Sequence, residues 1–179
     1  MIIQYSRIVS IPENVLVQKR KNSLLFIGPL GRTTLNLQSI DPKGLAAISI
    51  NQKEQIIHIL TSSKLLHGLY KTQLSNRIYG VLRGYLMYLK IIGVGYRAHL
   101  DKNILFFKLG YSHDLVFQVP LSIRVFLIDP TLVCLFGLDK NQITHIASKI
   151  CHLRRPSVYK GKGIRLLDEN IFIKTGKKK

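Results

Sequence analysis

The feature of this sequence that most constrains its fold is an internal repeat. Residues 25–31 (LFIGPLG) and 104–110 (ILFFKLG) are apolar runs that both close on Leu-Gly and start 79 positions apart. Each run precedes another β-type run, and each copy ends in a candidate helix, at 64–83 or at 140–152. A repeat of this length indicates duplicated domains and not a solenoid of short units.

The first copy is predicted to contain short strands followed by one helix. The apolar side chains of the helix recur at the spacing of a single buried face, and Gly84 follows where a left-handed residue commonly ends a helix. These apolar residues are Leu66, Tyr70, Leu74, Ile78 and Leu82. The predicted strands are 15–19, 24–27, 33–37, 46–50 and 56–60.

The second copy is predicted to repeat this order. Asp139 and Gln142 resemble a capping box at the start of its helix, and Pro156 ends the helical pattern. The predicted strands are 86–94, 97–100, 104–108, 115–119, 123–127 and 132–136. Strands followed by one packing helix in each half predict an α+β fold of two tandem similar domains, each a small, mostly antiparallel β-sheet with one α-helix. The expected parts are an N-terminal domain (1–84), a C-terminal domain (85–153) and a basic extended C-terminal segment (154–179).

The charge balance indicates the kind of partner. The chain has 27 Lys and Arg against 9 Asp and Glu, a formal net charge of +18. Such self-repulsion is unfavourable in a freely diffusing enzyme, whereas a nucleic-acid partner neutralises it. A membrane partner is not expected, because the most apolar stretch, 85–96, is broken by Lys90 and is too short to span a bilayer. No secretory signal is expected either, because the N-terminus reaches Pro12 without an apolar core.

The positive charge is most concentrated in residues 154–165 (RRPSVYKGKGIR). Five of these twelve side chains are cationic and none is acidic. Pro156, Gly161 and Gly163 disfavour a helix, so the sequence predicts an extended, mobile strip that neutralises phosphates. Tyr159 could stack on an unpaired base. The alternative is a solvated basic tail without a fixed partner.

Other motifs carry little sign of chemistry. Gly93-Val94-Gly95 resembles half of a dinucleotide fingerprint, but no third glycine opens a helix after it, so a bulge or a close backbone approach is expected. Cys134 and Cys151 belong to no Cys-x-x-Cys pair and are expected to be reduced, buried and free of metal. The scattered acids suggest no catalytic arrangement, and neither catalytic nor metal-binding residues are predicted.

The same segments resemble the large-subunit ribosomal protein six family in its bacterial and organellar form. The motifs keep the family's order and separations over essentially the full length. They are 92–98 (IGVGYRA), 109–113 (LGYSH), 137–140 (GLDK), 154–156 (RRP) and 159–165 (YKGKGIR), with 6–8 (SRI) and 11–12 (IP) at the start.

The resemblance implies a non-catalytic structural constituent of the large ribosomal subunit that supports translation and needs no cofactor. Its partners would be large-subunit ribosomal RNA, near the stalk base and the sarcin–ricin loop, and the neighbouring large-subunit ribosomal proteins; no membrane and no small-molecule substrate is implied. The rRNA-binding residues carried over from the family are Arg154, Arg155, Tyr159, Lys160, Gly161, Lys162, Gly163 and Arg165.

The composition suggests which ribosome. Scarce acids and abundant Ile, Leu, Asn and Lys suggest a mitochondrial ribosome, with a plastid or a bacterial cytoplasm as alternatives. The alternative function is a free-standing RNA-binding protein or RNA chaperone that uses the same strip.

Overall fold

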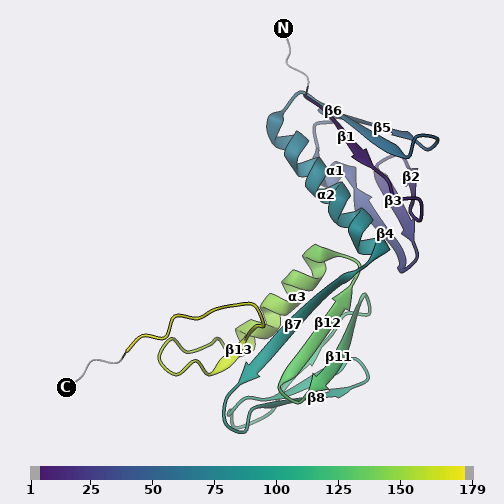
Figure 1. Cartoon of the computed structure of the whole chain (residues 1–179). Coiled ribbons are helices and arrows are strands. Elements are labelled where there is room, and N and C mark those ends of the chain that lie inside the picture. The colour runs from purple at the N-terminus through teal and green to yellow at the C-terminus, as the bar shows by residue number, and fades with distance from the viewer. Residues whose placement is uncertain (1–4, 176–179) are drawn as a thin grey trace. The chain divides into compact units, whose positions relative to one another are not determined.

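A computed structural model describes residues 5–175. The chain divides into two compact units, Met1–Gly84 and Tyr85–Lys179, which we call the first and the second domain (Figure 1).

The first domain packs α2 against two antiparallel sheets, which in the described residues have the strand orders β1-β6-β5 and β2-β3-β4. Its core is apolar and includes Leu24, Phe26, Ile57, Ile59 and Leu74, all fully buried. The elements are β1 Tyr5–Ser10, β2 Leu16–Lys19, β3 Ser23–Gly28, β4 Gly31–Asn36, α1 Leu37–Ile40, β5 Ala46–Asn51, β6 Ile56–Thr61 and α2 Lys64–Leu82.

The second domain packs α3 against one side of a four-stranded sheet of order β11-β12-β7-β13, and a second sheet of order β10-β9-β8 completes its core. The fully buried side chains Leu89, Leu105, Phe107, Leu135 and Ile164 come from both sheets. The elements are β7 Tyr85–Ile92, β8 Arg97–Asp101, β9 Ile104–Lys108, β10 Leu115–Gln118, β11 Ile123–Asp129, β12 Leu132–Gly137, α3 Lys140–Leu153 and β13 Gly163–Leu166.

The two domains share one topology, which confirms the predicted α+β fold of tandem similar domains. Strands β1 to β6 and helix α2 correspond in order to β7 to β12 and α3. With this correspondence, β1-β6-β5 matches β7-β12-β11 and β2-β3-β4 matches β8-β9-β10. Both helices lie close to their predicted ranges. Gly84 ends α2 with φ of 75°, and its N–H donates to the carbonyls of Tyr79 and Gly80. Asp139 caps α3 by accepting a hydrogen bond from the backbone N–H of Asn141 at 3.0 Å.

The repeat is real, but the alignment of the two Leu-Gly runs is wrong by two residues. In the hairpins β2–β3 and β8–β9, Lys19 pairs with Leu24 and Leu100 pairs with Leu105. Leu24 therefore corresponds to Leu105, 81 positions later and not 79. The runs mislead because β3 enters β4 through a tight turn, whereas residues 109–114 form a longer loop between β9 and β10.

Three elements are absent from the sequence prediction: β1, α1 and β13. The last of these corrects the picture of residues 154–179 as an extended segment outside the second domain. Residues 163–166 instead pair with β7, and Ile164 is fully buried in the core. The strip therefore leaves the domain at the end of α3 and re-enters its sheet.

The Gly93-Val94-Gly95 segment is a turn between β7 and β8. The ring of Tyr96 lies directly over Gly93, where an added Cβ would come within 2.4 Å of it. The segment is therefore not a bulge, and the group that approaches Gly93 closely is a tyrosine side chain and not backbone.

Candidate nucleic-acid interface

Residues 154–165, which we call the cationic loop, form an ordered, closed structure. Backbone hydrogen bonds join its two sides: the N–H of Ile164 donates to Arg154 O at 2.9 Å, and that of Ser157 donates to Lys162 O at 3.0 Å. The N–H of Gly161 also donates to Ser157 O at 2.8 Å. The predicted mobile strip is therefore a closed loop, because its backbone groups pair with one another.

Gly163 is where the two sides of the loop come closest. A Cβ at this position would lie 2.6 Å from Pro156 Cα and 2.8 Å from Arg154 O, both backbone atoms. Because neither neighbour can rotate away, only glycine fits here. Gly161 adopts φ of +66°, a left-handed conformation that glycine reaches without strain, and its surroundings are open by comparison.

Arg154 is fixed at the base of the loop by an aromatic pair that the sequence reasoning missed. Its guanidinium lies 4.6 Å from the ring centroid of Tyr111, within the range of a cation–π contact. The Tyr111 hydroxyl donates to Leu153 O at 3.1 Å and, through a hydrogen bond, also raises the pKa of Arg154 above its ordinary value. The ring of Tyr96 lies against Gly110, next to Tyr111. Tyr96 and Tyr111 fall in segments 92–98 and 109–113. The family motifs in these segments were the sequence signal that could have identified the two tyrosines.

The outer part of the loop presents four of the predicted side chains to solvent. Arg155, Lys160 and Lys162 are exposed, and Tyr159 is 62% exposed. They thus form a group of three cations and one aromatic ring on a closed backbone. Such a group can pair its cations with the negatively charged phosphates of RNA and can pack its ring on a base.

Arg165 does not join this group. It lies in β13, directly opposite Lys90 of β7, so its side chain belongs to the sheet and not to the loop tip. The structure therefore separates the eight predicted residues into four exposed side chains, two glycines that shape the loop, an anchored Arg154 and a strand residue, Arg165.

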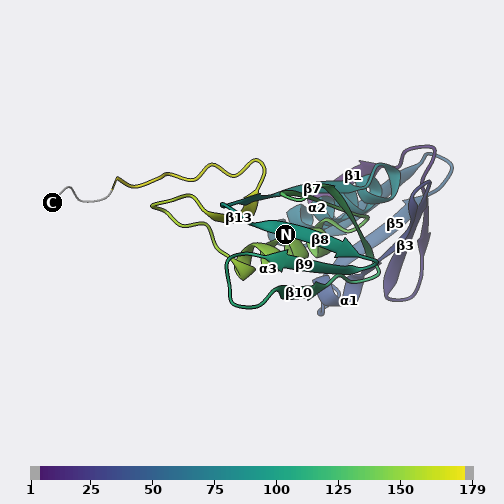
Figure 2. The same cartoon turned by 90° about the horizontal axis from the view of Figure 1, so that it is seen from below.

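The chain after β13 returns along the loop. The backbone N–H of Lys174 donates to Val158 O at 2.9 Å, and Ile173 Cδ1 lies near Gly161. Figures 1 and 2 show the yellow-green loop and the yellow segment that follows β13 side by side. Phe172 is 93% exposed, so this return segment adds an aromatic ring close to the loop.

A metal site, reactive cysteines or a membrane-spanning helix would each indicate a different function. Within residues 5–175, no group of three His, Cys, Asp or Glu side chains is placed to hold a metal ion. Both cysteines are free thiols; burial raises the pKa of Cys134, and it raises that of Cys151 to about 11 with a smaller contribution from Glu169. None of the helices described combines the length and apolarity that crossing a bilayer requires.

Two copies of one α+β unit, a net charge of +18 and an exposed cationic loop define a small basic protein of the kind found in ribonucleoprotein particles. The family model described as Ribosomal protein L6 matches residues 92–166, which include most of the second domain and the whole cationic loop.

Relatives match over nearly the whole chain. The large ribosomal subunit protein uL6m of Prototheca wickerhamii is 41% identical, with 96% of this chain and 95% of the relative covered. That of Reclinomonas americana is 34% identical, with 97% of each covered. The bacterial protein uL6 of Mycoplasmoides gallisepticum is 36% identical, with 96% of this chain and 94% of the relative covered. The chain therefore belongs to the ribosomal protein L6 family, as the motifs indicated.

Proposed function

We propose that this protein is a structural, non-catalytic constituent of the large ribosomal subunit that holds large-subunit rRNA through the cationic loop. The observation that carries the proposal is the exposure of Arg155, Tyr159, Lys160 and Lys162 together on a closed backbone. A prearranged loop loses less conformational entropy on binding than a mobile tail does. The family's relatives, named as large ribosomal subunit proteins, support the same assembly.

Seven of the eight predicted residues, all except Arg165, then have a distinct part. Arg155, Lys160 and Lys162 contact phosphates, and Tyr159 packs on a base or sugar. Gly161 and Gly163 shape the loop, and Arg154 anchors it on Tyr111. Phosphate contacts position a protein without reading sequence, and RNA helices are recognised largely by shape and backbone. We therefore expect the loop to bind a folded rRNA region. We propose that this region lies near the stalk base and the sarcin–ricin loop, beside neighbouring large-subunit proteins, as the family resemblance implies.

The proposed location is the mitochondrial ribosome. Two of the relatives reported above carry the mitochondrial name uL6m, and the composition is typical of an organellar chain. A plastid or bacterial ribosome is the alternative, which the bacterial relatives keep open. Mass spectrometry of large subunits purified from isolated mitochondria would find the protein if the proposal holds and would lack it otherwise.

The competing function is a free-standing RNA-binding protein or RNA chaperone. Sedimentation distinguishes the two, because a ribosomal constituent co-migrates with the large subunit through a moderate-salt gradient, whereas a chaperone stays near the top. We expect co-migration.

The binding site is tested by the triple variant Arg155→Ala, Lys160→Ala, Lys162→Ala, assayed against a transcript of the large-subunit rRNA. If all three cations contact phosphates, the slope of log affinity against log salt falls by roughly 2 to 3, at about 0.7–0.9 per contact. The fold should persist because the three side chains are exposed. Arg154 and Arg165 are left unchanged because each also has a structural environment of its own.

The matched control is Lys53→Ala, Lys64→Ala, Lys71→Ala, which removes three exposed cations from the first domain. It lowers the net charge equally and should leave most of the affinity and of the salt slope intact. Equal losses in the two variants would mean that net charge alone matters, and the assignment to the loop would then be wrong.

A further inference from the structure

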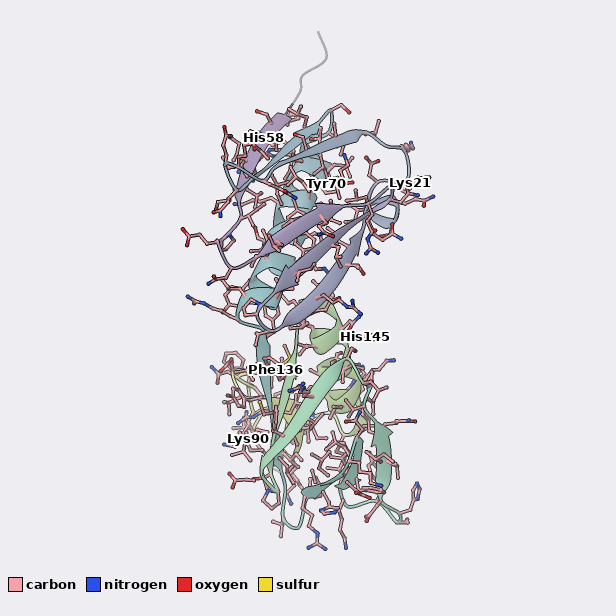
Figure 3. The ribbon with its side chains drawn as sticks, turned by 90° about the vertical axis from the view of Figure 1, so that its right-hand side faces the viewer. Lys21, His58, Tyr70, Lys90, Phe136 and His145 are labelled. Atoms are coloured by element: carbon pink, nitrogen blue, oxygen red, sulfur yellow. The ribbon has the colours of Figure 1, made fainter. Side chains whose placement is uncertain are left out.

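Within the described residues of the second domain, α3 packs on one side of the four-stranded sheet, and the opposite side, which we call the outer face, carries the exposed side chains of Lys90, Arg124 and Phe126. The side that faces α3 packs in the core. Because alternate side chains of a strand point to opposite sides, Tyr88 and Lys90 of β7 lie on the outer face, whereas the buried Leu89 and Ile91 point inward. Figure 3 labels Lys90 and Phe136 on this sheet.

A pair of like charges lies at one edge of the outer face. Arg165 of β13 is directly opposite Lys90 of β7, an arrangement that is unfavourable in an antiparallel pair. The Nε atom of Arg165 is buried and, within the part of the chain that the structure describes, has no hydrogen-bond partner. Asp129 occupies the same row but is separated from Lys90 by Leu132. An external group with several negatively charged oxygens would offset the repulsion between these two cations.

Aromatic side chains lie beside this pair. In the register, Phe126 and Tyr88 are the two neighbours of Cys134, and Phe126 is 50% exposed. In the row beyond, Arg124 is opposite Phe136. Cations interleaved with exposed rings are typical of surfaces that bind unpaired RNA, where phosphates meet the cations and bases stack on the rings. Three cations against one acid favour a polyanion over a protein neighbour as the occupant.

The first domain supplies an internal comparison. Thr61 and Gly137 each lie three residues before the first residue of α2 or α3, so β6 and β12 align residue by residue. Their partners then place Ser10 at the position of Lys90, Ile8 at that of Tyr88 and Ser49 at that of Phe126. Arg124 likewise corresponds to Ala47. The same sheet therefore forms with an uncharged outer face, and the cations and rings of the second domain are not needed for the topology.

We propose that the outer face of the β11-β12-β7-β13 sheet is a second RNA-binding surface. Lys90, Arg124 and Arg165 hold backbone phosphates, and Phe126 with Tyr88 provides a platform for an unpaired base. The proposal rests on the proposed function of this chain as an rRNA-binding protein, and it adds a surface that is separate from the exposed tip of the cationic loop.

Two full-length variants that borrow the first domain's residues test the proposal with the large-subunit rRNA transcript as probe. Lys90→Ser with Arg124→Ala removes two exposed cations, so affinity should fall about tenfold and the salt slope by about 1.4–1.8. Phe126→Ser removes a ring but no charge, so affinity should fall at least about fivefold with the slope unchanged. The charge control is Lys53→Ala with Lys64→Ala, and thermal melts report whether each variant is folded.

The outcomes separate this proposal from the one on the cationic loop. If the loop triple variant loses affinity and both outer-face variants bind like the wild type, the outer-face proposal is overturned, and a protein neighbour becomes the occupant of that face. If the loop triple variant also binds normally, the proposed function fails as well. Two results together support the outer-face proposal. The variant Lys90→Ser with Arg124→Ala should lose affinity and show a smaller salt slope, and Phe126→Ser should lose affinity with the salt slope unchanged.

Discussion

The two domains of this protein differ most after their helices. In the first domain, α2 ends at Leu82, and only Arg83 and Gly84 follow it before the second domain begins. In the second domain, α3 is followed by the cationic loop and by β13, which adds a fourth strand to the sheet that corresponds to β1-β6-β5. The two domains thus share the topology and the apolar core, whereas the cationic loop, which we propose binds RNA, is present only in the second domain.

A second difference lies between the third and fourth strands of each domain. The first domain connects β3 and β4 through Pro29 and Leu30 alone, since Gly28 pairs with Gly31. The second domain instead inserts residues 109–114, which carry Tyr111 to the base of the cationic loop. The longer connection therefore provides the support that the added loop requires.

The largest expected effect tests whether the two cores are equivalent. Phe26 and Phe107 occupy corresponding positions and are both fully buried, so replacing either by Ala should cost about 3–5 kcal/mol of unfolding free energy. Hydrogen exchange, followed peptide by peptide, would report in which domain protection is lost. We expect each variant to weaken mainly its own domain, and losses spread evenly over the chain would contradict this.

Gly163 tests the part that only the second domain has. Gly163→Ala drives a Cβ into the backbone of Pro156 and Arg154, and we expect a loss of about 2–3 kcal/mol together with weaker rRNA binding. Gly95→Ala is the control: it also has positive φ, at 72°, but nothing lies within 4 Å, so about 1 kcal/mol is expected. Equal losses in chemical denaturation would show that the contact with Pro156 does not constrain the loop.

The difference between the domains also explains what the sequence could and could not predict. Strands such as β6 and β12 are runs of apolar residues bounded by turns, and the helices follow a regular apolar spacing, so their positions follow from local pattern. In β13 the only apolar side chain that is fully buried is that of Ile164, which is flanked by a glycine and an arginine. Its strand partner β7 lies about 70 residues earlier in the chain. Pairing over that separation leaves no local signal.

The candidate site was predictable in its residues but not in its form. Charge and glycine content predict residues 154–165 as the candidate site, because five cationic side chains are concentrated there in sequence. The hydrogen bond from Ile164 to Arg154 and the support from Tyr111 depend on contacts between distant segments. The outer-face cations Lys90 and Arg124 were missed for the same reason, since only strand pairing brings them onto one face of the sheet.

A smaller effect is expected where the longer β9–β10 connection meets the loop. Tyr111→Phe removes the hydroxyl that donates to Leu153 O, so it should cost about 1 kcal/mol of stability and reduce rRNA affinity a few-fold. The control is Tyr159→Phe, which changes an exposed ring at the loop tip in the same way. If the two variants melt at the same temperature, the hydroxyl of Tyr111 does not support the loop.

The smallest effect uses the cysteines, both of which lie in the second domain. Burial raises the pKa of Cys151 to about 11, so at pH 9 only about one per cent of it should be thiolate, against about half for an ordinary thiol. Iodoacetamide should therefore modify Cys151 slowly in the folded protein and rapidly after unfolding. Because folding favours the protonated form, this contribution to stability is complete below about pH 9 and is lost as pH rises toward 11. Modification of the folded protein at the rate of a free thiol would show that Cys151 is accessible and its pKa ordinary.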